Sequence, residues 1–166
     1  MKQNIINISG FEVSNIHPFF LIAGPCSIES KDHAINHAGI INEICKKLSV
    51  NFVYKSSFDK ANRSSKNSHR GIGIEKGLII LSDVKKEFNI PILTDVHESY
   101  QCKEIANVVD IVQIPAFLCR QTDLLTAAAE TGKIINIKKG QFLAPWDMEN
   151  VLNKVLDVGN KNVMLT

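Results

Sequence analysis

Short apolar runs alternate with longer amphipathic segments along the whole chain. Runs such as 19–23 and 52–54, the latter within a predicted strand 52–56, are short and continuously apolar, which is typical of strands buried on both faces. Segments such as 32–48 and 73–88 carry apolar residues three or four positions apart, which predicts helices that bury one face. The same alternation predicts strands at 90–96, 110–114, 134–138 and 163–165, and helices near 102–106, 122–131 and 145–158.

The regular order of strand then helix indicates a parallel sheet with right-handed crossovers. Two α/β architectures fit, an open doubly wound sheet and a (β/α)8 barrel. No G-x-G-x-x-G motif or P-loop follows a strand, as a nucleotide-binding open sheet would have. Polar residues instead follow successive strands, which favours the barrel. These residues are Cys26, Lys55, Asp95, His97, Gln113, Lys138 and Lys139.

Length decides how much of a barrel the chain can form. A complete (β/α)8 barrel takes about 250 residues, so 166 residues predict a TIM barrel truncated to about six strands. Apolar residues also alternate on both sides of Ser9–Gly10, which predicts a small hairpin within residues 1–14. We therefore expect residues 1–166 to form a single incomplete barrel domain that begins with a hairpin.

The segment 51–70 begins as a strand and continues as a basic loop. Five cations and the single anion Asp59 give it a formal charge of +4, whereas the whole chain carries +2. Most of its other residues are hydroxyls and amides, which together with cations are suited to binding phosphate or carboxylate. A solvated basic loop is the alternative reading. Its position after a strand, with polar residues at other strand ends, favours anion binding.

Composition excludes several classes of protein. Hydrophobic residues make up 45% and charged residues 22%, as in ordinary soluble domains. A mildly basic sequence pI near 8.3 does not suggest a nucleic-acid partner. No run approaches the ~20 apolar residues of a membrane span, and residues 1–10 do not resemble a signal peptide, so we expect no membrane and a cytoplasmic location. The four cysteines form no CxxC pair, which predicts free thiols.

Five sequence blocks carry a resemblance to a known family. They are IAGPCSIES at 22–30, KSSFDKANRSS at 55–65, TDVHE at 94–98, QIPAFLCRQTDLL at 113–125 and INIKKGQFLAPWDM at 135–148. Together they resemble the 3-deoxy-D-manno-octulosonate 8-phosphate synthases, also named 2-dehydro-3-deoxyphosphooctonate aldolases. The neighbouring 3-deoxy-D-arabino-heptulosonate 7-phosphate synthases share the first block but have Lys-Pro-Arg-Thr where this chain has Lys-Ala-Asn-Arg-Ser-Ser.

The resemblance implies a (β/α)8 barrel that forms a homotetramer. It also implies condensation of phosphoenolpyruvate with D-arabinose 5-phosphate in lipopolysaccharide synthesis, with release of phosphate. By motif, four residues would surround phosphoenolpyruvate: Lys55, Lys60, Gln113 and Lys138. Asp95 would lie near the reacting carbons. The backbone at Ala116 and Phe117 would line the pocket for carboxylate and phosphate.

The resemblance also assigns the sugar phosphate and the acid–base chemistry. Asn62, Arg63 and Ser64 would hold the sugar phosphate, and Arg120 would reach it from a neighbouring subunit. Lys60, Asp95 and Lys138 are the candidate catalytic residues. Lys138 has two open readings, as a proton donor to the aldehyde oxygen or as a simple phosphate-binding cation.

Cys26 matches the cysteine that distinguishes the metal-dependent class of these enzymes. A thiolate suits a divalent metal such as zinc, iron or manganese, so the resemblance implies a metal at this position. The other ligands would lie in the roughly 100 further residues of a complete barrel. We accordingly expect 166 residues alone to be poorly stable and inactive. The remaining alternatives are a synthase that uses erythrose 4-phosphate and a non-catalytic remnant.

Overall fold

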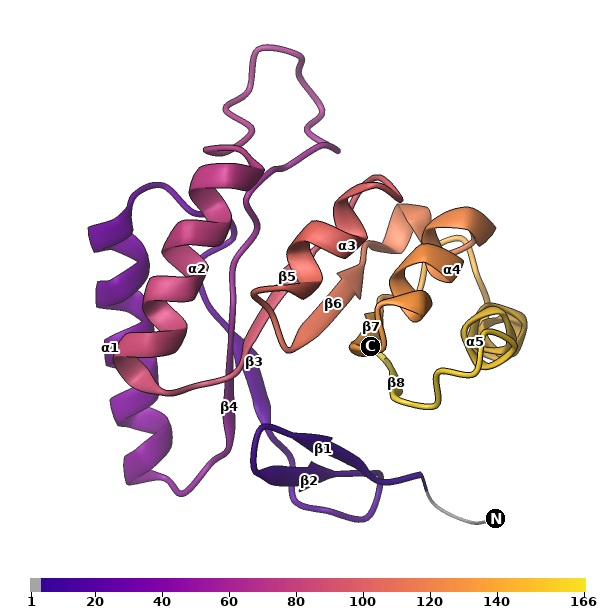
Figure 1. Ribbon diagram of the computed structural model, residues 1–166, viewed down its shortest axis with the longest axis horizontal. Helices are drawn as coiled ribbons and strands as arrows, with labels where there is room; N and C mark the ends of the chain where they lie inside the picture. The colour runs from indigo at the N-terminus through magenta and orange to yellow at the C-terminus, as the bar shows by residue number, and fades with distance from the viewer. Residues whose placement is uncertain (1–3) are drawn as a thin grey trace.

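Six parallel strands form one curved sheet, with a helix between each strand and the next (Figure 1). The computed structural model describes residues 4–166. Along the sheet and along the chain, the strands are β3 (Leu21–Ala23), β4 (Phe52–Lys55), β5 (Ile92–Asp95), β6 (Ile111–Ile114), β7 (Ile134–Ile137) and β8 (Val163–Leu165). Because the strand order never reverses, the sheet has no switch point of the open doubly wound kind. The predicted truncated barrel is therefore confirmed.

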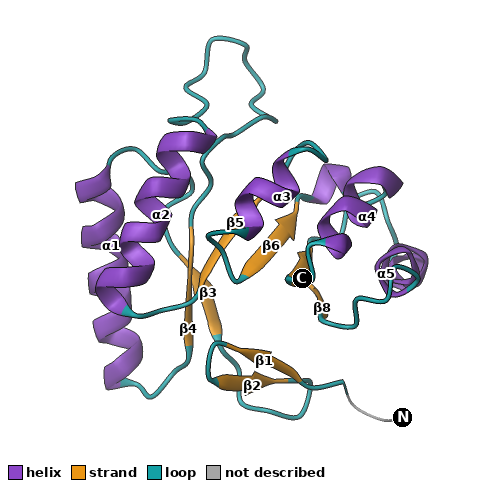
Figure 2. Cartoon of the chain, in the orientation of Figure 1, coloured by secondary structure: helices purple, strands orange, loops and turns teal. Residues whose placement is uncertain are grey.

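The helices flank the strands, as Figure 2 shows. They are α1 (Lys31–Lys47), α2 (Ile74–Phe88), α3 (Gln101–Ala106), α4 (Thr122–Glu130) and α5 (Met148–Leu156), with short 3-10 helices η1 (Ala116–Leu118) and η2 (Pro145–Asp147). None of the helices within residues 4–166 has the length and apolar character needed to cross a membrane. All four cysteines are free, and only Cys26 is exposed.

Most element boundaries match the prediction to within one or two residues. The last helix differs, because Pro145 begins a 3-10 turn and α5 starts only at Met148. The carboxylate of Asp147 accepts a hydrogen bond from the backbone N–H of Ala144 at 3.2 Å, which stabilises this turn before the regular helix begins. Gly132 and Gly159 have positive φ after the last turns of α4 and α5, as expected of residues that end helices.

Residues of each strand point alternately to the helices and to the interior of the curved sheet. Outward residues such as Tyr54 and Val112 pack in the large core beneath the helices. Inward residues such as Val53, Leu93 and Ile111 form a second, smaller core. The register places Leu93 beside Ile111, so these side chains form a continuous apolar layer inside the sheet.

The N-terminal hairpin covers this inner apolar layer. Strands β1 (Ile6–Ile8) and β2 (Phe11–Val13) pair antiparallel around Ser9 and Gly10, which both have positive φ. The hairpin's apolar residues pack against the inner core, and the Ser9 hydroxyl donates to the Asp110 carboxylate at 3.1 Å. The hairpin lies at the end where the sheet strands begin (Figure 1). The predicted hairpin is thus confirmed, although residues 1–3 of the predicted 1–14 unit lie outside the described residues.

Replacement of Ile8 tests whether the hairpin stabilises the sheet. Ile8 is fully buried in the inner core, so Ile8→Ala should lower the free energy of unfolding by about 2–5 kcal/mol, measured by urea denaturation. Ile5→Ala is the matched control, because Ile5 precedes the same strand and is 49% exposed. Its expected cost is below about 0.5 kcal/mol. Equal losses in the two variants would show that the hairpin does not close the core.

Candidate active site

A cavity of about 350 Å³ lies at the carboxyl ends of strands β4 to β7. Three lysines and one carboxylate residue line it. Eight of the residues expected at the site line it: Lys55, Lys60, Asn62, Asp95, Gln113, Ala116, Phe117 and Lys138. The remaining lining residues are Ala61, His97, Pro115, Leu118 and Gln141. Residues from four separate strand ends are therefore brought together, as a barrel predicts.

The sheet register positions the polar residues that rise from the strands. Asp95 of β5 is directly paired with Gln113 of β6, and Gln113 with Asn136 of β7. The Asn136 amide donates to the Gln113 side-chain oxygen at 3.2 Å. Asn136 is almost fully buried and was not predicted as a site residue, because it lies within a run of isoleucines. It fixes the orientation of the Gln113 amide at the cavity wall.

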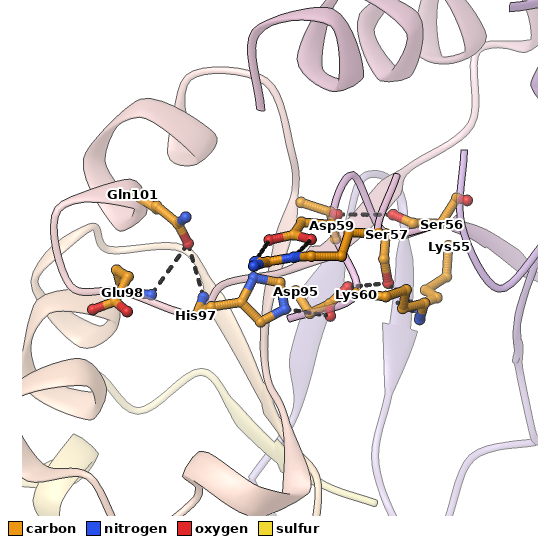
Figure 3. Close-up of polar contacts among 11 residues, drawn as sticks. Lys55, Ser56, Ser57, Asp59, Lys60, Asp95, His97, Glu98 and Gln101 are labelled. Carbon is orange, nitrogen blue, oxygen red and sulfur yellow. Dashed lines mark hydrogen bonds and ion pairs between the residues drawn. The ribbon is translucent and has the colours of Figure 1, made fainter. Parts of the chain in front are cut away.

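The carboxylate of Asp95 is buried and surrounded by hydrogen-bond donors (Figure 3). Burial alone raises its pKa, but hydrogen bonds from His97 and Ser57 and the charge of Lys55 outweigh this effect and lower the pKa to about 2. His97 Nε2 lies 3.2 Å from one carboxylate oxygen. Asp95 therefore remains ionised at neutral pH.

Ser57 is a shared partner of three charged groups, and sequence reasoning did not single it out as a site residue. Its hydroxyl donates to the carboxylate of Asp95 and accepts hydrogen bonds from Lys55 Nζ and Lys60 Nζ, each at 2.9 Å. The sequence did carry one signal for Ser57. Side chains two positions apart on a strand share a face, so residues 53, 55 and 57 all lie on the inward side of β4 and its extension. Figure 3 shows the three groups converging on this hydroxyl.

The two strand-end lysines Lys55 and Lys138 differ in exposure. Burial lowers the pKa of Lys55, and the neighbouring charges of Lys60 and Lys138 lower it further, whereas Asp95 acts in the opposite direction. Lys138 follows β7, lines the cavity and is exposed. Of these two lysines, Lys55 is therefore the one that is half-buried and has a lowered pKa.

The loop 60–70 projects beyond the ends of the helices and is closed at its base (Figure 1). The guanidinium of Arg70 donates two hydrogen bonds to the carboxylate of Asp59, and the backbone N–H of Lys60 donates to the Arg70 carbonyl at 2.6 Å. Lys60 and Asn62 lie at the cavity, whereas Arg63 and Ser64 are exposed on the outer part of the loop. Arg63 Nε donates to the His69 carbonyl at 3.2 Å.

Arg120 does not line this cavity. It lies on a separate depression with Leu143, Asp147 and Lys154, and its carbonyl accepts a hydrogen bond from Lys154 Nζ at 2.8 Å. Within one chain, Arg120 is thus separate from the other expected site residues.

Cys26 is an exposed thiol in the loop after β3. It is not among the residues that line the cavity. Within residues 4–166, no group of three or more His, Cys, Asp or Glu side chains could hold a metal ion. A catalytic metal site needs about three protein ligands, so the described residues do not by themselves form one.

Comparison with known proteins gives consistent results. A sequence model of the DAHP synthetase I family matches residues 8–166. A protein of Bartonella henselae named 2-dehydro-3-deoxyphosphooctonate aldolase is 62% identical over 97% of this chain and 58% of its own length. Proteins of the same name from Rickettsia bellii and Brucella anthropi are 58% and 57% identical, over 99% and 97% of this chain. The chain spans about three fifths of the length of these curated relatives.

The low pKa of Asp95 should make stability depend on pH in acid. Because its pKa falls from 3.8 to about 2 on folding, the ionised carboxylate contributes stability above about pH 4, and this contribution is lost as the pH falls toward 2. We expect a loss on the order of 2 kcal/mol over that interval, measured by urea denaturation at each pH. Asp95→Asn should remove this part of the pH dependence. Parallel curves for the two proteins would contradict the assignment.

The ion pair at the base of the loop should hold Lys60 in place. Arg70→Gln removes the guanidinium from Asp59, so the backbone N–H of Lys60 should exchange with solvent on the order of tenfold faster, measured by NMR hydrogen exchange. Lys66→Gln is the control, because it removes the same charge from the exposed part of the same loop. Equal acceleration in both variants would indicate an effect of charge alone.

Proposed function

The chain belongs to the DAHP synthetase I family, and on this basis we propose that its cavity binds phosphoenolpyruvate for an aldol-type condensation. The proposed second substrate is D-arabinose 5-phosphate. With water, the products are 3-deoxy-D-manno-octulosonate 8-phosphate and phosphate, in lipopolysaccharide synthesis in the cytosol. The convergence of Lys55, Lys60 and Lys138 on one cavity is the observation that carries this proposal. The names of the relatives support it.

The charge in the cavity suits this substrate. Phosphoenolpyruvate carries a carboxylate and a phosphate on neighbouring atoms, so several cations must converge to bind it. Three lysines against one carboxylate leave an excess of positive charge at the carboxyl ends of the strands. The side-chain amide of Gln113, oriented by Asn136, adds a neutral hydrogen-bonding group at the cavity wall.

The environments of the charged residues suggest separate roles. Asp95 remains ionised above about pH 2, so it would act as a negative charge near the reacting carbons and not as a proton donor. Lys138 is exposed, which favours its role as a phosphate-binding cation. Lys55 is the half-buried lysine with a lowered pKa, which makes it the better candidate for proton transfer to the aldehyde oxygen. Holding the two substrates in line would supply much of the rate enhancement.

The sugar phosphate and the metal involve residues at the edge of the site or outside it. Asn62, Arg63 and Ser64 would hold the sugar phosphate if the loop 60–70 folds toward the cavity. Arg120 would serve a neighbouring subunit of a homotetramer, because it lies outside the cavity of its own chain. Cys26 supplies one soft donor for a metal, and further ligands would lie outside the described residues. The proposed roles of the three lysines do not depend on that metal.

One observation favours a second candidate function. The matching family is described as DAHP synthetase I, and 3-deoxy-D-arabino-heptulosonate 7-phosphate synthases use erythrose 4-phosphate as the second substrate. The block Lys-Ala-Asn-Arg-Ser-Ser at 60–65 and the names of the relatives favour arabinose 5-phosphate. An assay of phosphate release with each sugar separates the two. We expect release with arabinose 5-phosphate when the chain is joined to the part of the Bartonella henselae relative beyond the match.

Binding of phosphoenolpyruvate by the chain tests the proposed cavity directly. Lys138→Ala should weaken the affinity about tenfold in calorimetric titration, because it removes one charge-assisted hydrogen bond. Lys47→Ala is the matched control, since it removes the same charge from the last turn of α1 without touching the cavity. At physiological salt its affinity should equal that of the unaltered chain. A chain that does not bind phosphoenolpyruvate would refute the proposal.

A further inference from the structure

We infer that Ser57 is a positioning residue, whose hydroxyl is a spacer that keeps the ammonium groups of Lys55 and Lys60 off the Asp95 carboxylate and available to an anionic ligand. The inference rests on the proposed function, because that function supplies the anion. The geometry of the hydroxyl carries it, as the contacts in Figure 3 show.

The hydroxyl of Ser57 has no spare hydrogen-bonding capacity. A serine hydroxyl has one proton to donate and two lone pairs that accept. Here the proton goes to Asp95, and the lone pairs accept from Lys55 Nζ and Lys60 Nζ at 2.9 Å each. Ser57 is fully buried, so water has no access to replace it. The two nitrogens therefore lie no farther apart than twice that distance, which sets an upper limit on the separation of two like charges.

The spacing between Lys55 and Asp95 shows what the hydroxyl prevents. Lys55 Nζ lies 3.9 Å from the nearer carboxylate oxygen, beyond direct hydrogen-bond contact. Two opposite charges this close in a buried site attract strongly, so an ammonium free to move would form the direct ion pair. Such a pair would neutralise the cation and turn it away from the cavity. The intervening hydroxyl satisfies both charges and leaves the remaining N–H donors of each lysine for a ligand.

The neighbouring residue Ser56 provides a matched control for this role. Ser56 is also fully buried, but its hydroxyl donates to the Pro25 carbonyl at 2.9 Å. Among the described contacts it makes no hydrogen bond to Lys55, Lys60 or Asp95. Removing either hydroxyl deletes one buried oxygen from adjacent positions, but only one of the two deletions affects the lysines.

The test compares Ser57→Ala with Ser56→Ala by two measurements. The first is the titration midpoint of Lys55, followed by NMR of lysine labelled at the ε carbon. In Ser57→Ala we expect the midpoint to rise by about one pH unit, because Lys55 moves into direct contact with Asp95. The second is the affinity for phosphoenolpyruvate, which should fall about tenfold in Ser57→Ala. Ser56→Ala should leave both quantities unchanged.

A third variant keeps the inference testable if Ser57→Ala does not fold. Ser57→Cys retains a group of similar size that donates and accepts weakly, so intermediate changes are expected. An unchanged Lys55 midpoint in the Ser57 variants, or equal changes in Ser56→Ala, would overturn the spacer role. If the unaltered chain does not bind phosphoenolpyruvate, the proposed function fails, whereas the Lys55 titration still decides whether Ser57 acts as a spacer.

Discussion

Neighbouring parallel strands in this molecule pair in register, and this pairing decides what occupies the interior of the sheet. Inward side chains of adjacent strands fall into layers, with apolar residues such as Leu93 and Ile111 in one layer and polar residues such as Asp95 and Gln113 in the next. A shift of one residue would exchange the two faces of a strand and turn the helix-facing residues inward. The inner core, the hairpin's contacts and the cavity all depend on this register.

Electrostatics within the polar layer follow from one buried anion. A carboxylate removed from water requires partners, and Asp95 obtains them from a hydroxyl, an imidazole and a lysine. These partners keep the carboxylate ionised, and its negative charge in turn attracts cations at the carboxyl ends of the strands. Because the cations outnumber the anion, the cavity retains net positive charge. Structural stability and the proposed anion binding therefore draw on the same group of residues.

The sequence predicted the strand order and the strand-end residues because both follow from local patterns. Lys55, Asp95, Gln113 and Lys138 each end a strand that alternation identifies, and parallel pairing brings such ends together. Period two places Ser57 on the inward side of its strand, but the hydrogen bonds that Ser57 and Asn136 make to neighbouring strands do not show in any local pattern, so both were missed. The sequence did not show that Lys138 is exposed, since exposure after a strand end depends on the path of the following loop.

The ion pair between Asp59 and Arg70 was missed for a similar reason. It closes a loop, and the two residues are not related by the regular spacing of a helix or a strand. The 3-10 turn at Pro145 was missed because helix propensity does not predict where a 3-10 turn ends and an α-helix begins. Here the hydrogen bond from the Ala144 N–H to the Asp147 carboxylate stabilises the turn. Sequence reasoning thus located the candidate site at the ends of strands. It did not locate the groups that hold that chemistry in position.

The N-terminal hairpin has a consequence for how the polypeptide acquires its shape. Asn4, just before the hairpin, donates to the carbonyl of Lys161, a contact that spans 157 residues. Ser9 likewise reaches Asp110, 101 residues away. Contacts this distant in sequence form slowly, because a long loop must close before they are made. During synthesis on the ribosome, the hairpin therefore makes these contacts only after Asp110 and Lys161 have been added, and until then the apolar layer that it covers is open to chaperones or to aggregation.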